Sequence, residues 1–122
     1  MDWSFRNDQP IYSQLIQRLT EAIVSGVYAP GEKLPSVREL ALEAGVNPNT
    51  VQRSLTELER EGLVFSQRTA GRFVTENENM IVNAKLRIAD ERVSEFLRSM
   101  KTLGCGRQEI ISLIEGAKEN EE

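Results

Sequence analysis

The 122-residue sequence contains no histidine and only one cysteine, Cys105. Without histidine, imidazole general-base catalysis, Ser-His and Cys-His nucleophile pairs and the common zinc ligand sets are excluded. A single cysteine cannot form an intrachain disulfide. The carboxylates and lysines that remain show no spacing typical of a catalytic pair. We therefore expect no metal, no cofactor and no enzymatic activity.

Long apolar runs are also missing, and none approaches the roughly 20 residues that a membrane-spanning helix needs. The first eight residues include acids and no apolar segment, which is not typical of a secretion signal. We therefore expect a cytoplasmic protein with no membrane partner.

An excess of positive charge is missing: 15 Lys/Arg are outnumbered by 19 Asp/Glu, and the net charge of −4 argues mildly against a nucleic-acid partner. The acids are concentrated in the C-terminal part, however. Residues 1–75 carry eight Lys/Arg and nine Asp/Glu, whereas residues 76–122 carry seven and ten. A DNA-binding face needs only local positive charge, so the overall balance does not exclude one.

Residues 1–75 show the signals of three helices. Apolar residues recur at helical spacing over residues 11–25, and Gly26 is a typical helix stop. Ser36 and Glu39 have the spacing of a capping box, which predicts a short helix that ends at Gly45.

A third helix and a hairpin are predicted next. Asn47 is suited to an N-cap and Pro48 to the first helical position. Two short strands follow at residues 63–67 and 72–75, joined by a turn that contains Gly71.

Smaller features complete this part of the sequence. Residues 33–34 are predicted to form a very short strand, and Trp3 and Phe5 are expected to pack onto the fold. Tyr12 is also expected to pack, with a phosphate contact as the alternative.

Residues 76–122 are predicted to be a helical dimerisation region. Apolar residues spaced alternately by four and three form a heptad seam: Val82, Leu86, Ala89, Val93, Phe96, Met100 and Leu103. Gly104 and Gly106 end this helix, a short last helix follows, and the acidic residues 119–122 are expected to fray. Because so long an exposed seam would be unstable in a monomer, we expect a homodimer.

Two short helices with a tight turn between them, followed by a hairpin, predict a winged helix-turn-helix. The fold class is then mainly α (α+β), with a DNA-binding domain at residues 1–75 and a two-helix tail. We expect the polar residues at the helix starts, on the second helix of the motif and at the hairpin tip to contact double-stranded DNA: Ser36, Arg38, Asn47, Asn49, Thr50, Gln52, Arg53, Arg68, Thr69, Gly71 and Arg72.

Each of these residue types has a physical reason for its role. Asn and Gln pair bidentately with adenine, and Arg pairs with guanine, in the major groove. Helix N-termini favour a phosphate. Arginines of a hairpin are attracted to the minor groove or the backbone.

Four blocks of the sequence resemble the GntR family of repressors. They are PIYSQL at 10–15, GEKLPSVRELA at 31–41, GVNPNTV at 45–51 and LEREGLV at 58–64. The resemblance covers residues 10–75 and implies DNA contacts by Arg38, the start of the third helix and the hairpin. Many relatives have Arg at the positions of Pro48 and Gln52, so their operator sequences do not carry over.

The NPNTV version of the third block and the short helical tail are similar to the YtrA-type subfamily. This resemblance implies a homodimer and, often, an operon that encodes an ABC transporter. We predict a sequence-specific, homodimeric repressor on a two-fold symmetric operator. The alternative is a winged helix that binds another protein, which would need apolar anchors over residues 49–56 where the sequence is polar.

Overall fold

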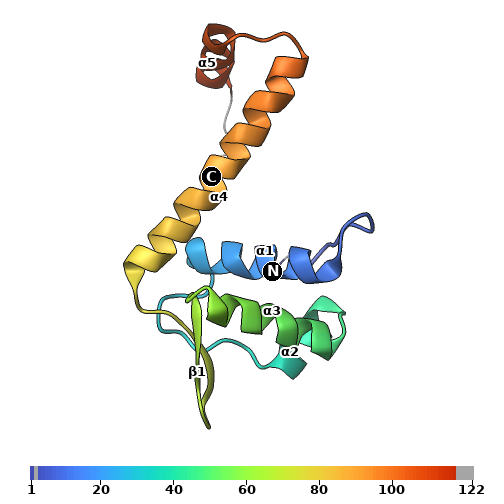
Figure 1. The fold of residues 1–122 in the computed structure, drawn as a ribbon, viewed down its shortest axis with the longest axis vertical. Coiled ribbons are helices and arrows are strands. Elements are labelled where there is room, and N and C mark those ends of the chain that lie inside the picture. The colour runs from blue at the N-terminus through green and yellow to red at the C-terminus, as the bar shows by residue number, and fades with distance from the viewer. Residues whose placement is uncertain (2, 118–122) are drawn as a thin grey trace. The chain divides into compact units, whose positions relative to one another are not determined.

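The computed structural model describes residue 1 and residues 3–117, so the acidic residues 119–122 lie outside the described part (Figure 1). The chain divides into two compact units, Met1–Lys85 and Leu86–Glu122. The fold is mainly helical, as predicted, and its elements are α1 (Ile11–Val24), α2 (Val37–Ala44), α3 (Pro48–Arg60), β1 (Val64–Gln67), β2 (Gly71–Val74), α4 (Glu78–Thr102) and α5 (Arg107–Gly116).

The helix signals of the sequence form as predicted. Ser36 Oγ accepts a hydrogen bond from the Glu39 backbone N–H at 3.1 Å, and Glu39 Oε1 accepts one from the Ser36 N–H at 2.8 Å. Gly45 ends α2 with φ +70°, a left-handed conformation that favours glycine. Asn47 Oδ1 then caps α3 by accepting from the Asn49 N–H at 2.7 Å. These bonds satisfy backbone groups that the first turn of a helix leaves unpaired.

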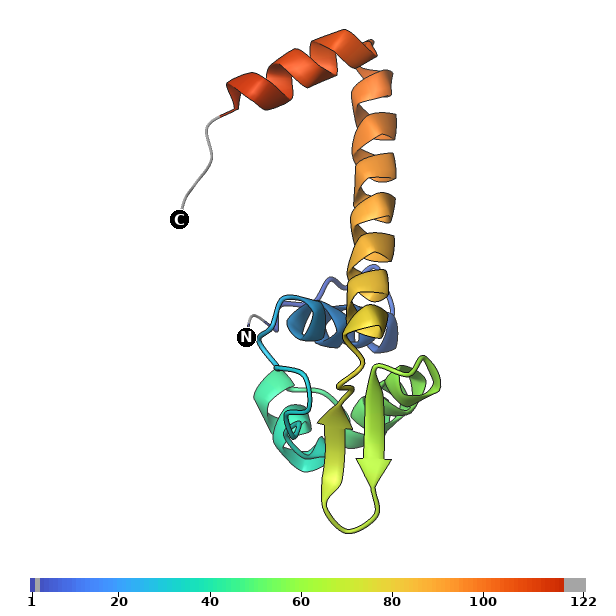
Figure 2. The ribbon, with the colours of Figure 1, turned by 90° about the vertical axis from the view of Figure 1, so that its left-hand side faces the viewer.

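The hairpin is an antiparallel pair in which Val64 lies opposite Val74. Lys33 forms an isolated bridge with Phe73, which confirms a very short extended stretch beside β2. Both strands begin and end within one residue of their predicted positions. Figure 2 shows the hairpin reaching beyond the neighbouring helices.

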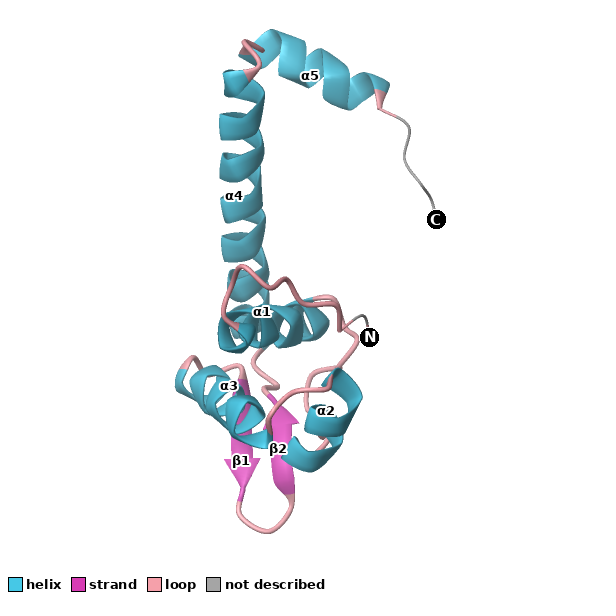
Figure 3. Cartoon of the chain, turned by 90° about the vertical axis from the view of Figure 1, so that its right-hand side faces the viewer, coloured by secondary structure: helices cyan, strands magenta, loops and turns pink. Residues whose placement is uncertain are grey.

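The core of the first unit lies where α1, α2 and α3 meet, below α1 in Figure 3. Its fully buried large side chains are Leu15, Leu19, Ile23, Leu40, Val51, Leu55, Leu58, Leu63 and Val74. Trp3 and Phe5 pack against this core, as expected. Ala84 of α4 is buried in the same cluster, so the compact unit continues past residue 75 into the first turns of α4. The division of roles at residue 75 stays a prediction.

The second unit contains most of the predicted heptad seam. Leu86, Val93 and Phe96 are 59%, 53% and 41% exposed, although they are large and apolar. In α5, Ile110 is buried, whereas Leu113 and Ile114 are exposed. Within the described residues, no helix is both long enough and apolar enough to span a membrane.

Candidate nucleic-acid interface

Helix α3 presents a polar face to solvent. Asn49, Gln52, Arg53 and Thr56 are exposed, and Thr50 is half-buried. The opposite side of the helix faces the core through Val51, Ser54, Leu55 and Leu58. The exposed face has no aromatic or aliphatic anchor, which disfavours the alternative of a protein-binding module.

The start of α2 offers a free cation. Arg38 is exposed and forms no hydrogen bond or ion pair among the described residues. Its two acidic neighbours on α2 have other partners, because Glu39 completes the capping box and Glu43 accepts from Trp3 Nε1 at 3.1 Å. The Ser36 hydroxyl is occupied by the same capping box. The geometry therefore leaves the Arg38 guanidinium available to a ligand.

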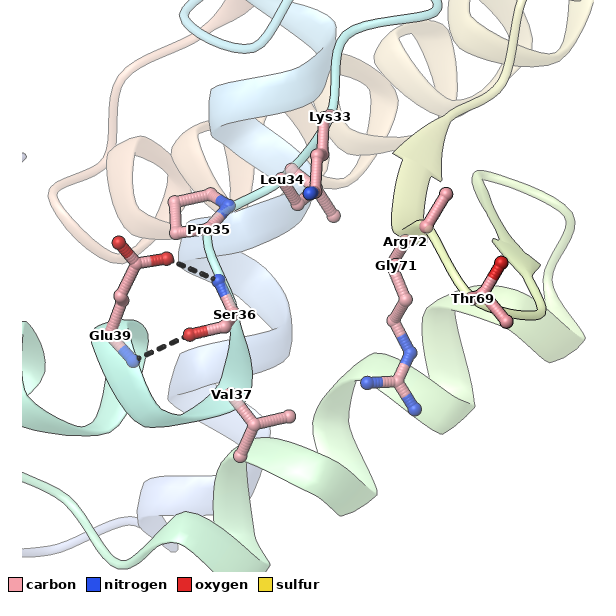
Figure 4. Close-up of a pocket in the computed structure, with 10 residues that line it drawn as sticks. Lys33, Leu34, Pro35, Ser36, Val37, Glu39, Thr69, Gly71 and Arg72 are labelled. Atoms are coloured by element: carbon pink, nitrogen blue, oxygen red, sulfur yellow. Dashed lines mark hydrogen bonds between the residues drawn. The ribbon is translucent and has the colours of Figure 1, made fainter.

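A pocket of about 350 Å³ lies between the start of α2 and the hairpin (Figure 4). Lys33 and Thr69 are among the residues that line it, and Lys33 is exposed. Gly71 has φ +111°, and a Cβ there would lie 3.1 Å from Lys33 Cε, so the glycine permits this close approach. Sequence reasoning missed Lys33 as a site residue. The signal available was a lysine three positions before the capping serine, in the short strand predicted at 33–34.

The hairpin tip and the strand residues behind it have different surroundings. Arg68 and Thr69 are exposed at the tip. Arg72 lies in β2 opposite Ser66, and its Nε donates to Glu59 Oε1 of α3 at 2.7 Å. Ser66 of β1 donates to Glu59 Oε2 at 2.8 Å. One carboxylate therefore fastens both strands to α3, and Arg72 has one of its donors occupied within the protein.

These contacts lower the pKa of the Glu59 carboxyl. Burial raises it, but hydrogen bonds from Arg72 and Ser66 and the charge of Arg72 favour the ionised form and lower the pKa overall. A depressed pKa in the folded state adds stability above the ordinary pKa of about 4.5. That stability is lost as the pH falls through the folded-state value.

Replacing Glu59 should therefore change the acid sensitivity of folding. We expect Glu59→Gln to lower the free energy of unfolding by about 1 kcal/mol at pH 7, and the difference from wild type to shrink below about pH 4.5. Urea unfolding at fixed protein concentration, from pH 3.5 to 7, measures this. Glu61→Gln is the matched control, because Glu61 is exposed and has no ion pair among the described residues. A pH-independent difference for Glu59→Gln would contradict the prediction.

Comparisons with known proteins agree with this geometry. Residues 11–74 match the family described as "Bacterial regulatory proteins, gntR family". The chain is 38% identical to YhcF, an uncharacterized HTH-type transcriptional regulator of Bacillus subtilis, over 97% of this chain and 95% of YhcF. It is 36% identical to the HTH-type transcriptional repressor YtrA of Bacillus subtilis, over 95% of each chain.

Solved structures give the same result. A GntR family transcriptional regulator from Listeria monocytogenes superposes with a TM-score of 0.87 and 35% identity, over 93% of this chain and all of that one. The DNA-binding domain of AraR, solved in complex with operator ORX1, superposes with a TM-score of 0.53 and 26% identity, over 62% of this chain and 92% of that one. The family matched by residues 11–74, and the two relatives matched along almost their whole length, show that the chain belongs to the GntR family of DNA-binding transcription regulators and is not an enzyme.

Proposed function

We propose that the protein is a homodimeric, sequence-specific repressor that binds a two-fold symmetric operator. The observation that carries this proposal is the exposed polar face of α3, together with Arg38 on the neighbouring α2, which has no ion-pair partner in the part of the chain that the structure describes. A helix with such a face fits the major groove, where amide and guanidinium groups read base edges. A DNA target also supports a cytoplasmic location.

The proposed contacts follow from the positions of the side chains. Asn49, Thr50 and Gln52 read bases, and Arg53 binds at the edge of the groove. Ser36, Arg38 and Asn47 lie at or near helix N-termini and bind phosphates. The hairpin tip enters the minor groove or follows the backbone with Arg68, Thr69 and Gly71. Arg72 contributes through the N–H groups that Glu59 leaves free.

The exposed seam of α4 supports a homodimer. Large apolar side chains at heptad spacing, half exposed in one chain, are stabilised when a second copy covers them. We propose that residues 76–122 form this interface through Val82, Leu86, Ala89, Val93, Phe96, Met100 and Leu103. A two-fold symmetric protein then requires a two-fold symmetric DNA site. The similarity to YtrA, a repressor, supports repression, and the YtrA-type resemblance supports a transporter operon as the target.

Two substitutions separate affinity from sequence specificity. We expect Arg38→Ala to weaken binding about tenfold to every duplex and to reduce the slope of log K against log salt by about 0.9 for each subunit. Gln52→Ala should instead change the preferred sequence, with a discrimination loss of about 1–3 kcal/mol at one base pair of each half-site. Selection from a random duplex pool gives the preferred sequence of each variant. Fluorescence anisotropy at a series of potassium chloride concentrations then gives the affinity and its salt dependence.

Arg18→Ala is the matched control, because Arg18 donates to the Ser4 backbone carbonyl at 2.9 Å and lies on α1 rather than on the proposed surface. Salt-insensitive wild-type binding without sequence preference would overturn the proposed function. Equal losses for Arg18→Ala and Arg38→Ala would remove Arg38 from the interface.

A further inference from the structure

Arg53 of α3 is stacked on an aromatic ring of α1. Its guanidinium carbon lies 4.2 Å from the centre of the Tyr12 ring. Arg53 is exposed, whereas Tyr12 is half-buried in the first turn of α1. A planar guanidinium over a tyrosine face is attracted by the ring electrons and loses conformational freedom.

The backbone at the start of α1, which carries Tyr12, is tied to neighbouring segments by hydrogen bonds. The Ser54 hydroxyl of α3 donates to the Thr50 carbonyl at 2.9 Å and also lies 3.4 Å from the Tyr12 carbonyl. Gln14, which is buried, accepts from the Arg6 N–H at 2.7 Å and donates to the Gln9 carbonyl at 3.0 Å. The half-buried Tyr12 ring therefore projects from an anchored helix start and supports Arg53.

Stacking leaves the hydrogen-bond donors of Arg53 free. The acid four residues further along α3 is Glu57, a natural partner for Arg53, but Glu57 is paired with Arg60. Within the described part of the chain, Arg53 forms no hydrogen bond or ion pair. The protein thus places this guanidinium over the Tyr12 ring, while its N–H groups stay open to a bidentate acceptor.

The position of Arg53 on α3 favours a phosphate as that acceptor. Gln52 and Glu59 are seven residues apart, so they share the side of α3 that faces the hairpin. Arg53 shares the other flank, beside Tyr12, with Arg60. When a helix lies in the major groove, its flanks meet the two sugar–phosphate backbones that form the groove walls.

We propose that Tyr12 is a positioning residue, which holds Arg53 ready to bind a phosphate of the DNA backbone. The proposal rests on the proposed function of α3. It adds that a residue outside the helix-turn-helix, Tyr12, sets the strength of one phosphate contact. Its effect is independent of base sequence.

The test compares full-length variants on two duplexes, one recovered by wild type from a random pool and one with the same composition in scrambled order. We expect Tyr12→Leu to weaken binding to both duplexes by about threefold to tenfold without changing the salt slope. Tyr12→Phe keeps the ring face and should bind like wild type. Arg53→Ala should weaken both duplexes further and lower the slope by about 0.9 for each subunit.

Two further variants keep the test independent of folding. The double variant Tyr12→Leu/Arg53→Ala should bind no more weakly than Arg53→Ala alone, because the two residues act through one contact. Arg53→Lys changes only an exposed side chain and should match Tyr12→Leu, since an ammonium lacks the planar fork. Thermal melting of each variant confirms that it is folded.

Any of three results would overturn the inference. They are losses of DNA affinity that add up in the double variant, wild-type affinity in Arg53→Lys, and weak DNA binding by Tyr12→Phe. A loss in Arg53→Ala that is confined to the selected duplex would show base reading and would also overturn it. Arg38→Ala is measured alongside: if it weakens binding and the Tyr12 variants do not, this inference alone fails. If wild type prefers neither duplex, the proposed function fails with it.

Discussion

Phe96→Asp is expected to convert the protein to a monomer and to weaken binding to a duplex with two half-sites by about 100-fold or more. Phe96 lies at a seam position of α4 and is 41% exposed in the single chain. In a dimer, the substitution would place two carboxylates in an apolar interface, where each has to be desolvated without a partner. Each DNA-binding unit would then bind its half-site without the high effective concentration that its partner provides.

Light scattering coupled to size exclusion, at about the micromolar concentrations used for binding, measures the oligomeric state. Ser94→Asp is the control, since Ser94 is exposed on the same helix and lies outside the seam. Phe96 belongs to the second compact unit, so the helical content and core of the first unit should be retained. A dimer that survives Phe96→Asp would show that the seam is not the interface.

Leu55→Ala is expected to lower the free energy of unfolding by about 2–5 kcal/mol. Leu55 is 1% exposed and lies on the buried side of α3. Its removal leaves a cavity beneath the polar face of that helix, and small domains have total stabilities of only about 5–15 kcal/mol. The melting temperature should fall by about 10 °C or more, and DNA affinity at 37 °C should fall with the folded fraction.

Leu42→Ala is a matched control, because Leu42 of α2 is 78% exposed and its truncation should change stability by about 0.5 kcal/mol or less. Urea unfolding at one fixed protein concentration compares the two variants. If both variants lose the same free energy of unfolding, then α3 is not anchored through Leu55. If Leu55→Ala is destabilised but keeps its DNA affinity at 37 °C, then the DNA-binding surface does not depend on the packing of Leu55.

Much of the first unit could be predicted from the sequence, because its helix boundaries depend on neighbouring residues. Ser36 and Glu39 cap α2 across three residues, and Asn47 caps α3 across two. The polar face of α3 followed from helical periodicity in the same way, and so did the exposed heptad seam. Three of the four strand boundaries shifted by one residue, since a strand extends only as far as its partner across the sheet pairs with it.

Contacts between distant residues could not be predicted in this way. Arg72 was predicted to contact DNA, and only the packed hairpin shows that Glu59, thirteen residues earlier, occupies its Nε. Tyr12 was expected to pack, and its partner Arg53, on another helix, follows only from the packing of α1 against α3. Lys33 became a site candidate because a bridge to Phe73 brings it beside the hairpin.

The amino-acid sequence alone therefore determined where the helices begin and end, which of their faces are apolar, and the family to which the chain belongs. Tertiary structure decided which of the exposed cations are free for a ligand. Helix starts and periodic faces depend on residues a few positions apart, whereas the partner of an arginine is set by the side chains that packing brings within about 4 Å of it.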